Sequence, residues 1–191
     1  MCCSLNRLIS SIVIGIVFAF AVSIACQTTV LAAAPFTDIG YFFSMPNELK
    51  DTWTLDSSNV NPNNGKSQYI YNRKGIVDNA GRKIIPGMSL MFESLKQKMD
   101  LTLYAGILTT QLGQNAKAIV DKVEPLNNTL VYKIRFWDKF HNEHTSLLQF
   151  GILQYKGEYY GVMAWLDGTT PVFPQIEGEM KKIVLEISKS F

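Results

Sequence analysis

Apolar and polar residues alternate most clearly over Thr129–Trp137 (TLVYKIRFW), which predicts a half-buried antiparallel strand. The apolar residues expected on one face of that strand are Leu130, Tyr132, Ile134 and Phe136. Two further extended segments follow, Thr145–Tyr155 and Glu158–Leu166, and the intervening Lys156-Gly157 predicts a two-residue hairpin turn. Ala118–Glu124 is expected to form a strand before them. The second half of the chain therefore predicts an antiparallel meander.

The first half of the chain predicts shorter extended segments separated by turns. Phe36–Met45 is rich in aromatic residues and ends at Pro46, which predicts a first strand followed by a turn. Ser57–Lys66 (SSNVNPNNGK) combines Asn, Pro and Gly and predicts a surface loop. We expect two more short strands and two more turns in this half. The strands are Ser67–Arg73 and Met88–Phe92, and the turns are Asn79–Arg82 and Pro86-Gly87.

Helical spacing of apolar residues occurs twice. Between Leu95 and Gly113 it predicts a helix that Gly113 ends, and the helix begins only at Leu101 if Asp100 is its N-cap. A last helix is expected after Asp167-Gly168, with Thr170 as its cap and Pro171 in its first turn. Its apolar stripe comprises Phe173, Ile176, Met180, Ile183, Val184, Ile187 and Phe191.

Strands that occur in runs, with one helix between them and one after them, predict the α+β class. The architecture that follows is an antiparallel β-sheet packed with helices, an α/β/α sandwich. We expect one globular domain over residues 35–191 and a separate segment over residues 1–34.

The segment over residues 1–34 has the pattern of an export signal. Leu8–Ala25 is an 18-residue run without a charged residue, and Arg7 precedes it. Three fates are open for this leader: cleavage as a signal peptide, retention as a membrane anchor, or lipidation at Cys26 after Ser23-Ile24-Ala25. The small residues before Ala33 favour cleavage after Ala32. We therefore expect an exported protein that is periplasmic or secreted, with a membrane tether only if the leader stays.

Charge and cysteine content narrow the function classes. No cysteine follows Cys26, so the expected domain contains no disulfide, thiol nucleophile or thiolate metal site. Loss of Arg7 with the leader lowers the count of basic residues from 18 to 17, against 16 acidic residues. Without a concentrated basic patch, this near balance argues against a nucleic-acid partner.

His141 and His144 (HNEH) are the only histidines, with Asp138 and Glu143 close in sequence. Two imidazoles and a carboxylate on a loop can hold a metal ion. The spacing does not place both histidines on one helix face, however, and no strong third ligand is evident. We interpret both as solvated residues of a polar turn, and expect no metal and no cofactor.

Other catalytic arrangements find no support in the sequence. A Gly-x-Ser-x-Gly nucleophile elbow is missing, and the glycines are too scattered for a phosphate-binding loop. Glu177 and Glu179 are expected on the solvated side of the last helix. Asn127-Asn128-Thr129 matches a glycosylation sequon but is interpreted as a turn.

Aromatic residues are concentrated in three places, and we expect about half of them to face the core. The groups are Tyr41-Phe42-Phe43, Phe136-Trp137 with Phe140, and Tyr159-Tyr160 with Trp165. Any exposed members are candidates for a partner or ligand surface.

The order of elements resembles the PsbP and Mog1-like superfamily. The residues that carry the resemblance are Tyr41–Pro46 (YFFSMP), the hairpin Leu148–Trp165 and the tail Glu179–Phe191. The resemblance covers the whole chain after the leader and implies a non-enzymatic accessory or partner-binding protein. It implies no particular site residue.

We therefore expect an exported, cofactor-free accessory protein of the cell envelope that binds an unknown envelope protein or small ligand. Its candidate rims are the His141 region and the Asn59–Lys66 loop. A small envelope hydrolase, or a carrier of a small apolar ligand in a pocket, is the alternative.

Overall fold

The computed structural model describes residues 34–191. The predicted leader, its cleavage after Ala32 and the lipidation of Cys26 lie outside these residues. Within the described part of the chain, none of the helices is long and apolar enough to cross a membrane.

The elements, in chain order, are α2 (Ile39–Phe42), the 3-10 turn η1 (Asn47–Leu49), β1 (Trp53–Asn61), β2 (Lys66–Arg73), β3 (Ile76–Val77), β4 (Lys83–Ile84), β5 (Gly87–Leu95), α3 (Leu101–Ala116), β6 (Ile119–Leu126), β7 (Thr129–Trp137), β8 (Glu143–Tyr155), β9 (Glu158–Thr169) and α4 (Phe173–Ser188).

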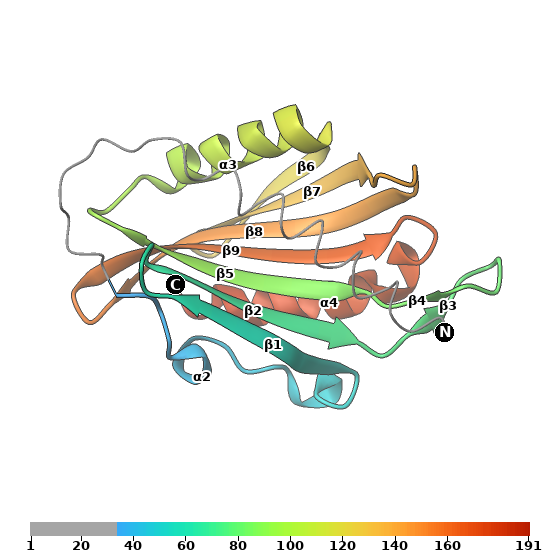
Figure 1. Ribbon diagram of the computed structural model, residues 1–191, viewed down its shortest axis with the longest axis horizontal. Coiled ribbons are helices and arrows are strands. Elements are labelled where there is room, and N and C mark those ends of the chain that lie inside the picture. Colours follow the sequence, from blue (N-terminus) through green and yellow to red (C-terminus); the bar gives the residue numbers. More distant parts are fainter. Residues whose placement is uncertain (1–33) are drawn as a thin grey trace.

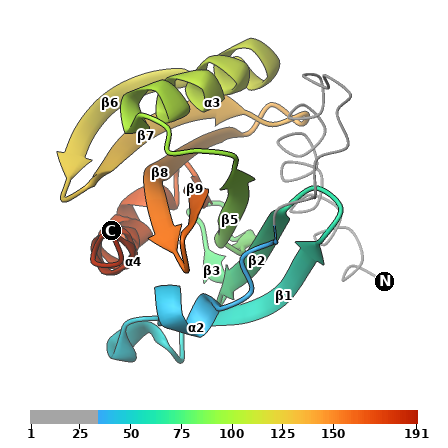
Figure 2. The ribbon, with the colours of Figure 1, turned by 90° about the vertical axis from the view of Figure 1, so that its left-hand side faces the viewer.

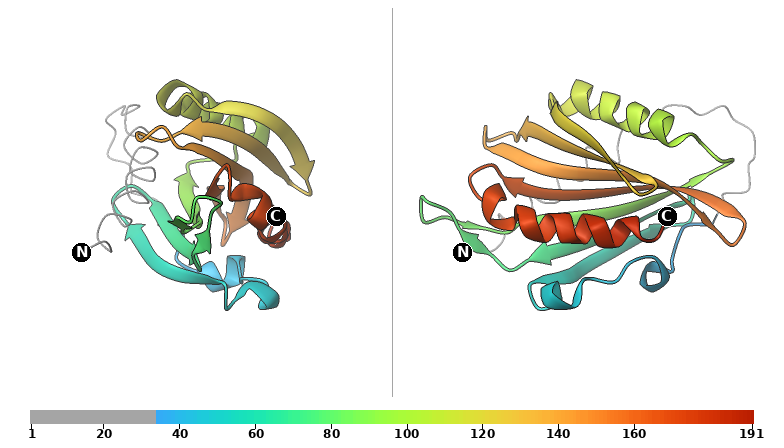
Figure 3. Two further views of the ribbon diagram at one scale, coloured as in Figure 1. Left: turned by 90° about the vertical axis from the view of Figure 1, so that its right-hand side faces the viewer. Right: turned by 180° about the vertical axis from the view of Figure 1, so that it is seen from behind.

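A seven-stranded antiparallel sheet, in the order β1-β2-β5-β9-β8-β7-β6, organises the molecule (Figure 1). The short strands β3 and β4 form a separate ribbon. Helix α3 packs on β7 and β8, while α4 packs on β8 and β9 from the other side of the sheet (Figure 2). Seen from behind, α4 lies along the back face of the sheet (Figure 3). The α+β prediction is confirmed, with an antiparallel sheet between two helices.

Each helix covers its own hydrophobic cluster. The larger cluster lies between the sheet and α4, where Ile176, Met180, Ile183 and Ile187 are fully buried. The smaller one lies under α3 and includes Tyr104, Leu148 and Phe150. Side chains on successive residues of a strand point to opposite faces, so β8 contributes Leu147 to one cluster and Leu148 to the other.

Most predicted strands of the sheet are confirmed. β7 has the predicted bounds Thr129–Trp137, and Lys156-Gly157 forms the β8–β9 turn with positive φ at both residues, as a type I′ hairpin requires. The turn at Asn127-Asn128 and the strand over Ser67–Arg73 are also confirmed.

The first predicted strand is wrong. Phe36–Met45 contains the short helix α2, capped by the Asp38 carboxylate, which accepts a hydrogen bond from the Tyr41 N–H. Its aromatic residues nevertheless reach the core: the Phe36 ring stacks on the Phe92 ring, with 4.4 Å between centroids. A high aromatic content indicates that a segment is buried, but it does not require a strand. A short helix with irregular flanks can bury the same side chains.

The predicted loop over Ser57–Lys66 is also wrong for most of its length. β1 runs to Asn61 and β2 starts at Lys66, which leaves only a four-residue turn between them. β1 is an edge strand whose side chains are mostly exposed, so polar residues are tolerated there. Residues 57–61 are extended because their backbone groups form hydrogen bonds with β2.

The end of α3 and the start of α4 differ from the prediction. Asp100 caps α3 as predicted, but the helix continues past Gly113 to Ala116 and ends at Lys117, which has φ 50°. α4 starts at Phe173 rather than after Thr170, because β9 continues to Thr169, which pairs with His144. The predicted apolar stripe of α4 is confirmed, with six of its members buried and Phe191 partly buried.

Candidate functional site

The turn between β7 and β8 presents two large aromatic side chains to solvent. Trp137 ends β7 with 42% of its surface exposed, and Phe140, within the turn, is 54% exposed. The Lys139 Nζ lies 4.9 Å from the centroid of the Phe140 ring. Ile119, on the neighbouring strand β6, is also exposed. We call residues 137–142 the aromatic turn.

Asp138 fixes the shape of the aromatic turn. Its Oδ1 accepts hydrogen bonds from the backbone N–H groups of Phe140 and Asn142, both at 2.8 Å. Its Oδ2 accepts from the Asn142 side-chain amide at 2.9 Å. An aspartate that accepts hydrogen bonds from the backbone ahead of it is a usual way to hold a tight turn. The exposed aromatic residues therefore stand on a well-defined backbone.

His144 lies beneath the aromatic turn, between two carboxylates. Its Nδ1 is 2.9 Å from Asp167 Oδ2 on β9, and its Nε2 is 3.6 Å from Asp138 Oδ2. The imidazole also stacks on Phe136, with 5.0 Å between ring centroids. The interpretation of both histidines as solvated is therefore wrong for His144, which is buried, while His141 is exposed in the turn. Strand pairing places His144 opposite Thr169 and so close to Asp167.

The cluster shifts the pKa of two of its members in opposite directions. Burial lowers the pKa of His144, but hydrogen bonds and negative charge from Asp167 and Asp138 outweigh it, so that the pKa is raised above its usual value. Burial raises the pKa of Asp138, but hydrogen bonds from Asn142 and Phe140 and the charge of His144 outweigh it, so that the pKa is lowered. The arrangement thus favours an imidazolium between carboxylates.

The same geometry limits the chemistry of His144. Both ring nitrogens face carboxylates, so neither points to a free nucleophile. The Ser146 hydroxyl donates to Asp167 Oδ1 at 2.6 Å, and a nucleophilic serine would instead donate to the imidazole. Among residues 34–191, no group of three or more His, Cys, Asp or Glu side chains is arranged to hold a metal ion. The cluster joins β8, β9 and the aromatic turn.

A second charged network joins the strands from the other face of the sheet. Arg135 on β7 donates two hydrogen bonds to Asp121 on β6, at 2.7 and 2.9 Å, and one to Glu143 on β8 at 3.3 Å. These bonds raise the pKa of the Arg135 guanidinium and lower that of the Asp121 carboxyl. Three neighbouring strands are therefore cross-linked directly below the aromatic turn.

The structure separates the two predicted rims. Lys66 aligns through β5 with Gly161 of β9, whereas His144 aligns with Thr169. Eight residues of strand, about 27 Å, lie between these positions, so the rims occupy opposite ends of the sheet. They cannot contact one small ligand together.

The glutamates of the last helix are partly buried rather than solvated. The Glu179 carboxylate accepts hydrogen bonds from Arg73 Nε and Nη2, at 2.8 and 2.7 Å, and from Trp53 Nε1 at 2.8 Å. These bonds, with the Arg73 charge, lower the pKa of Glu179. Glu177 pairs with Lys133 and Lys181. The expectation failed because Trp53, Arg73 and Lys133 lie on strands far away in the sequence, whereas Lys181 is one turn further along α4.

Sequence reasoning found His144, Trp137 and Phe140 but missed Asp167. In the sequence Asp167 precedes a glycine and suggested a turn, and it lies 23 residues after His144. Only the pairing of β8 with β9 shows that the two side chains meet. The aromatic expectation is confirmed in broad terms, since Phe42, Phe43, Phe136, Tyr160 and Trp165 are buried and Tyr41, Trp137 and Phe140 are exposed.

Comparison with known proteins gives no family for the chain. No family model and no curated protein sequence matches it. Among solved structures, it is similar to the crystal structure of protein Ms6760 from Mycobacterium smegmatis, with 12% sequence identity and a TM-score of 0.21. The match covers 82% of this chain and 81% of that one. A TM-score this low supports no conclusion about fold or function.

Proposed function

We propose that this protein is an exported accessory protein of the cell envelope that binds a partner protein through the aromatic turn. The observation that supports this most directly is the exposure of Trp137 and Phe140 on a turn held by the partly buried Asp138–His144–Asp167 cluster. Tryptophan and phenylalanine are enriched at protein interfaces, and a preorganised backbone reduces the entropy lost on binding.

The cellular setting rests on the uncharged run Leu8–Ala25, which is typical of an export signal. The fold is proposed to be PsbP/Mog1-like, because a middle helix, a meander of long strands, a closing helix and a Ser-Phe tail follow one another in that order. Such proteins are generally accessory or partner-binding modules, in keeping with this assignment.

The alternatives receive less support from the geometry. A hydrolase needs a base that is free to accept a proton from a nucleophile, whereas both nitrogens of His144 face carboxylates. A carrier of an apolar ligand encloses most of that ligand. The hollow along α3, about 550 Å³ in volume, is open to solvent and is lined largely by one face of that helix.

Site-specific photocrosslinking in cells tests the proposal. A photoreactive phenylalanine analogue replaces Phe140 in one full-length variant and Leu55, exposed on β1, in a matched control. We expect a crosslinked species of discrete mass from position 140 only, and we expect Trp137→Ala to abolish it without changing the circular dichroism spectrum. Equal crosslinking from both positions would contradict the proposal. Turnover of an ester substrate that His144→Gln abolishes would favour the hydrolase instead.

A further inference from the structure

Helix α3 has an outer face that its packing does not explain. Its sixteen residues (LTLYAGILTTQLGQNA) contain no Asp, Glu, Lys, Arg or His. Tyr104, Ala105 and Leu112 face the core beneath the helix. Leu103 and Ile107 are 57% and 43% exposed. The solvent-facing side of a surface helix normally carries charged or polar residues. The exposed leucine and isoleucine of α3 are therefore unusual for a face that contacts only water.

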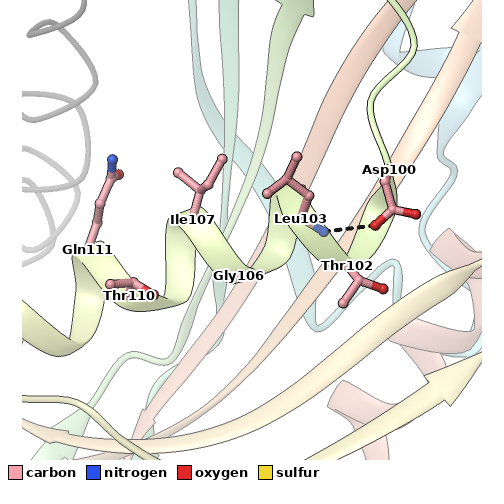
Figure 4. A pocket seen from close by; sticks show the side chains of 7 residues that line it. All are labelled: Asp100, Thr102, Leu103, Gly106, Ile107, Thr110 and Gln111. Carbon is pink, nitrogen blue, oxygen red and sulfur yellow. Dashed lines mark hydrogen bonds between the residues drawn. The ribbon is translucent and has the colours of Figure 1, made fainter.

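The exposed residues are aligned along one side of the helix. Leu103, Ile107 and Gln111 are spaced four residues apart, and their side chains project in the same direction (Figure 4). With Thr102, Gly106 and Thr110 they line the open hollow described above. Apart from Asp100, which also lines the hollow at the start of the helix, the surface along α3 is therefore uncharged, with its two large apolar side chains in the first half of the helix.

Three exposed lysines flank this uncharged face. Lys96 and Lys98 precede the helix, and Lys117 follows it directly. In the described part of the chain, none of the three forms an ion pair. Asp100 is the acidic residue at this face, and its carboxylate accepts a hydrogen bond from the Leu103 N–H. Positive charge at both ends of α3 is thus separated by about 24 Å of uncharged helix.

We infer that the outer face of α3 lies on an anionic membrane surface, independently of the aromatic turn. In that position Leu103 and Ile107 enter the interfacial region of the bilayer, and Lys96, Lys98 and Lys117 contact lipid phosphates. Long lysine side chains can reach the lipid head groups while the apolar side chains lie deeper in the bilayer. A lipid surface fits this composition better than a protein partner does, because lysine is depleted at protein interfaces.

The start of the described chain lies on the face of the sheet opposite α3. The Ala34 carbonyl accepts a hydrogen bond from the Tyr160 hydroxyl, and the Tyr160 side chain belongs to the cluster covered by α4. Cys26 lies eight positions before Ala34, a reach of about 28 Å when extended. A leader retained in the bilayer, or lipidated at Cys26, would therefore hold the folded part near the membrane without by itself turning α3 toward it, so the orientation of α3 rests on its own uncharged face and its flanking lysines.

Fluorescence of a solvent-sensitive probe on the full-length protein tests the inference. Cys2, Cys3 and Cys26 are replaced by serine, and one new cysteine, Ile107→Cys, carries the probe. The vesicles contain equal parts of phosphatidylglycerol and phosphatidylcholine, with brominated lipid as a quencher. We expect a blue shift and quenching at position 107, and neither for the control Leu185→Cys on α4, where the native leucine is exposed on the opposite side of the sheet. Because the probe reports the position of α3, attachment of the leader alone does not reproduce this difference.

Charge reversal then tests the lysines. Each lysine near an anionic surface strengthens binding roughly fivefold, so loss of three positive charges alone lowers the ratio of membrane-bound to free α3 about a hundredfold. Replacing all three by glutamate also adds repulsion and is expected to lower that ratio further. The matched control reverses three exposed lysines elsewhere and should leave the ratio unchanged: Lys50, Lys74 and Lys83. Vesicles of phosphatidylcholine alone should give a much weaker signal.

Two outcomes overturn the inference. One is a probe at position 107 that remains as solvent-exposed as the probe at 185 while the protein is attached to the vesicles. The other is shielding at 107 that requires an added protein and not lipid, which would make α3 a protein-binding surface. Neither outcome alters crosslinking at Phe140, so the proposed function is tested separately.

Discussion

His144 illustrates how much a single buried side chain depends on its neighbours. In water an imidazole gains little from a nearby carboxylate, but here one ring nitrogen contacts Asp167 and the other faces Asp138. The three side chains join the aromatic turn to β9. A protonated imidazole is the form that both carboxylates stabilise.

The stability of the protein is therefore expected to depend on the protonation of His144. Its folded pKa is raised, so its contribution is complete below the unfolded pKa of about 6.5 and is lost as the pH rises through the folded pKa. Chemical denaturation of the wild type should show a lower free energy of unfolding at pH 9 than at about pH 6. His144→Gln should lose this part of the pH dependence. An unchanged pH profile in that variant would show that another group is responsible.

Gly161 and Gly178 are expected to respond oppositely to alanine. A Cβ at Gly161 would lie 2.5 Å from the buried Tyr104 ring, whereas one at Gly178 on α4 meets nothing within 4 Å. Gly161→Ala should destabilise the protein by about 1–3 kcal/mol through overpacking. Gly178→Ala should stabilise it by roughly 0.5–1 kcal/mol, because alanine loses less backbone entropy in a helix. Thermal denaturation of both variants compares them, and destabilisation by both would contradict the packing argument.

Local sequence signals specified the elements to different degrees. Asp100 was a clear helix signal because an N-cap acts through residues three positions away, and its carboxylate does accept the Leu103 N–H at 3.0 Å. The end of α3 was less predictable, since Gly113 remains helical. β1 was missed because its polar residues are held by pairing with β2 and not by burial of alternate side chains.

The cap of α3 can be tested directly. Asp100→Ala should lower the free energy of unfolding by about 1 kcal/mol, because the Leu103 N–H loses its hydrogen-bond acceptor. Asp100→Asn retains an acceptor oxygen and should cost much less. Equal losses in the two variants would show that the charge near the helix N-terminus, and not the hydrogen bond, provides the stabilisation. Urea denaturation monitored by circular dichroism measures both.

For the molecule as a whole, the proposed binding surfaces and the apolar run belong to separate parts of the chain. The domain contains its own sheet and two hydrophobic clusters, each covered by a helix. The proposed binding surface at the aromatic turn and the proposed membrane surface on α3 both belong to this folded part. The apolar run Leu8–Ala25 precedes it.

Mass spectrometry of the protein purified from the envelope is expected to give an amino terminus at Ala33, because cleavage after Ala32 fits the small-residue pattern. The same measurement distinguishes the other fates of the leader. A lipid-modified Cys26 or an intact Met1 would replace cleavage by a membrane tether, and recovery of the intact chain from the cytoplasm alone would contradict export.

The sequence by itself determined the α+β class, most strands of the meander, the cap of α3 and the buried stripe of α4. These features depend on periodicity and on contacts between residues a few positions apart, which the order of amino acids contains directly. Only the tertiary structure decided that His144 meets Asp167, that Glu179 meets Arg73, and that β1 is a strand. Those outcomes depend on which strands and helices become neighbours, and the hydrogen bonds and charges involved act between residues distant in the sequence.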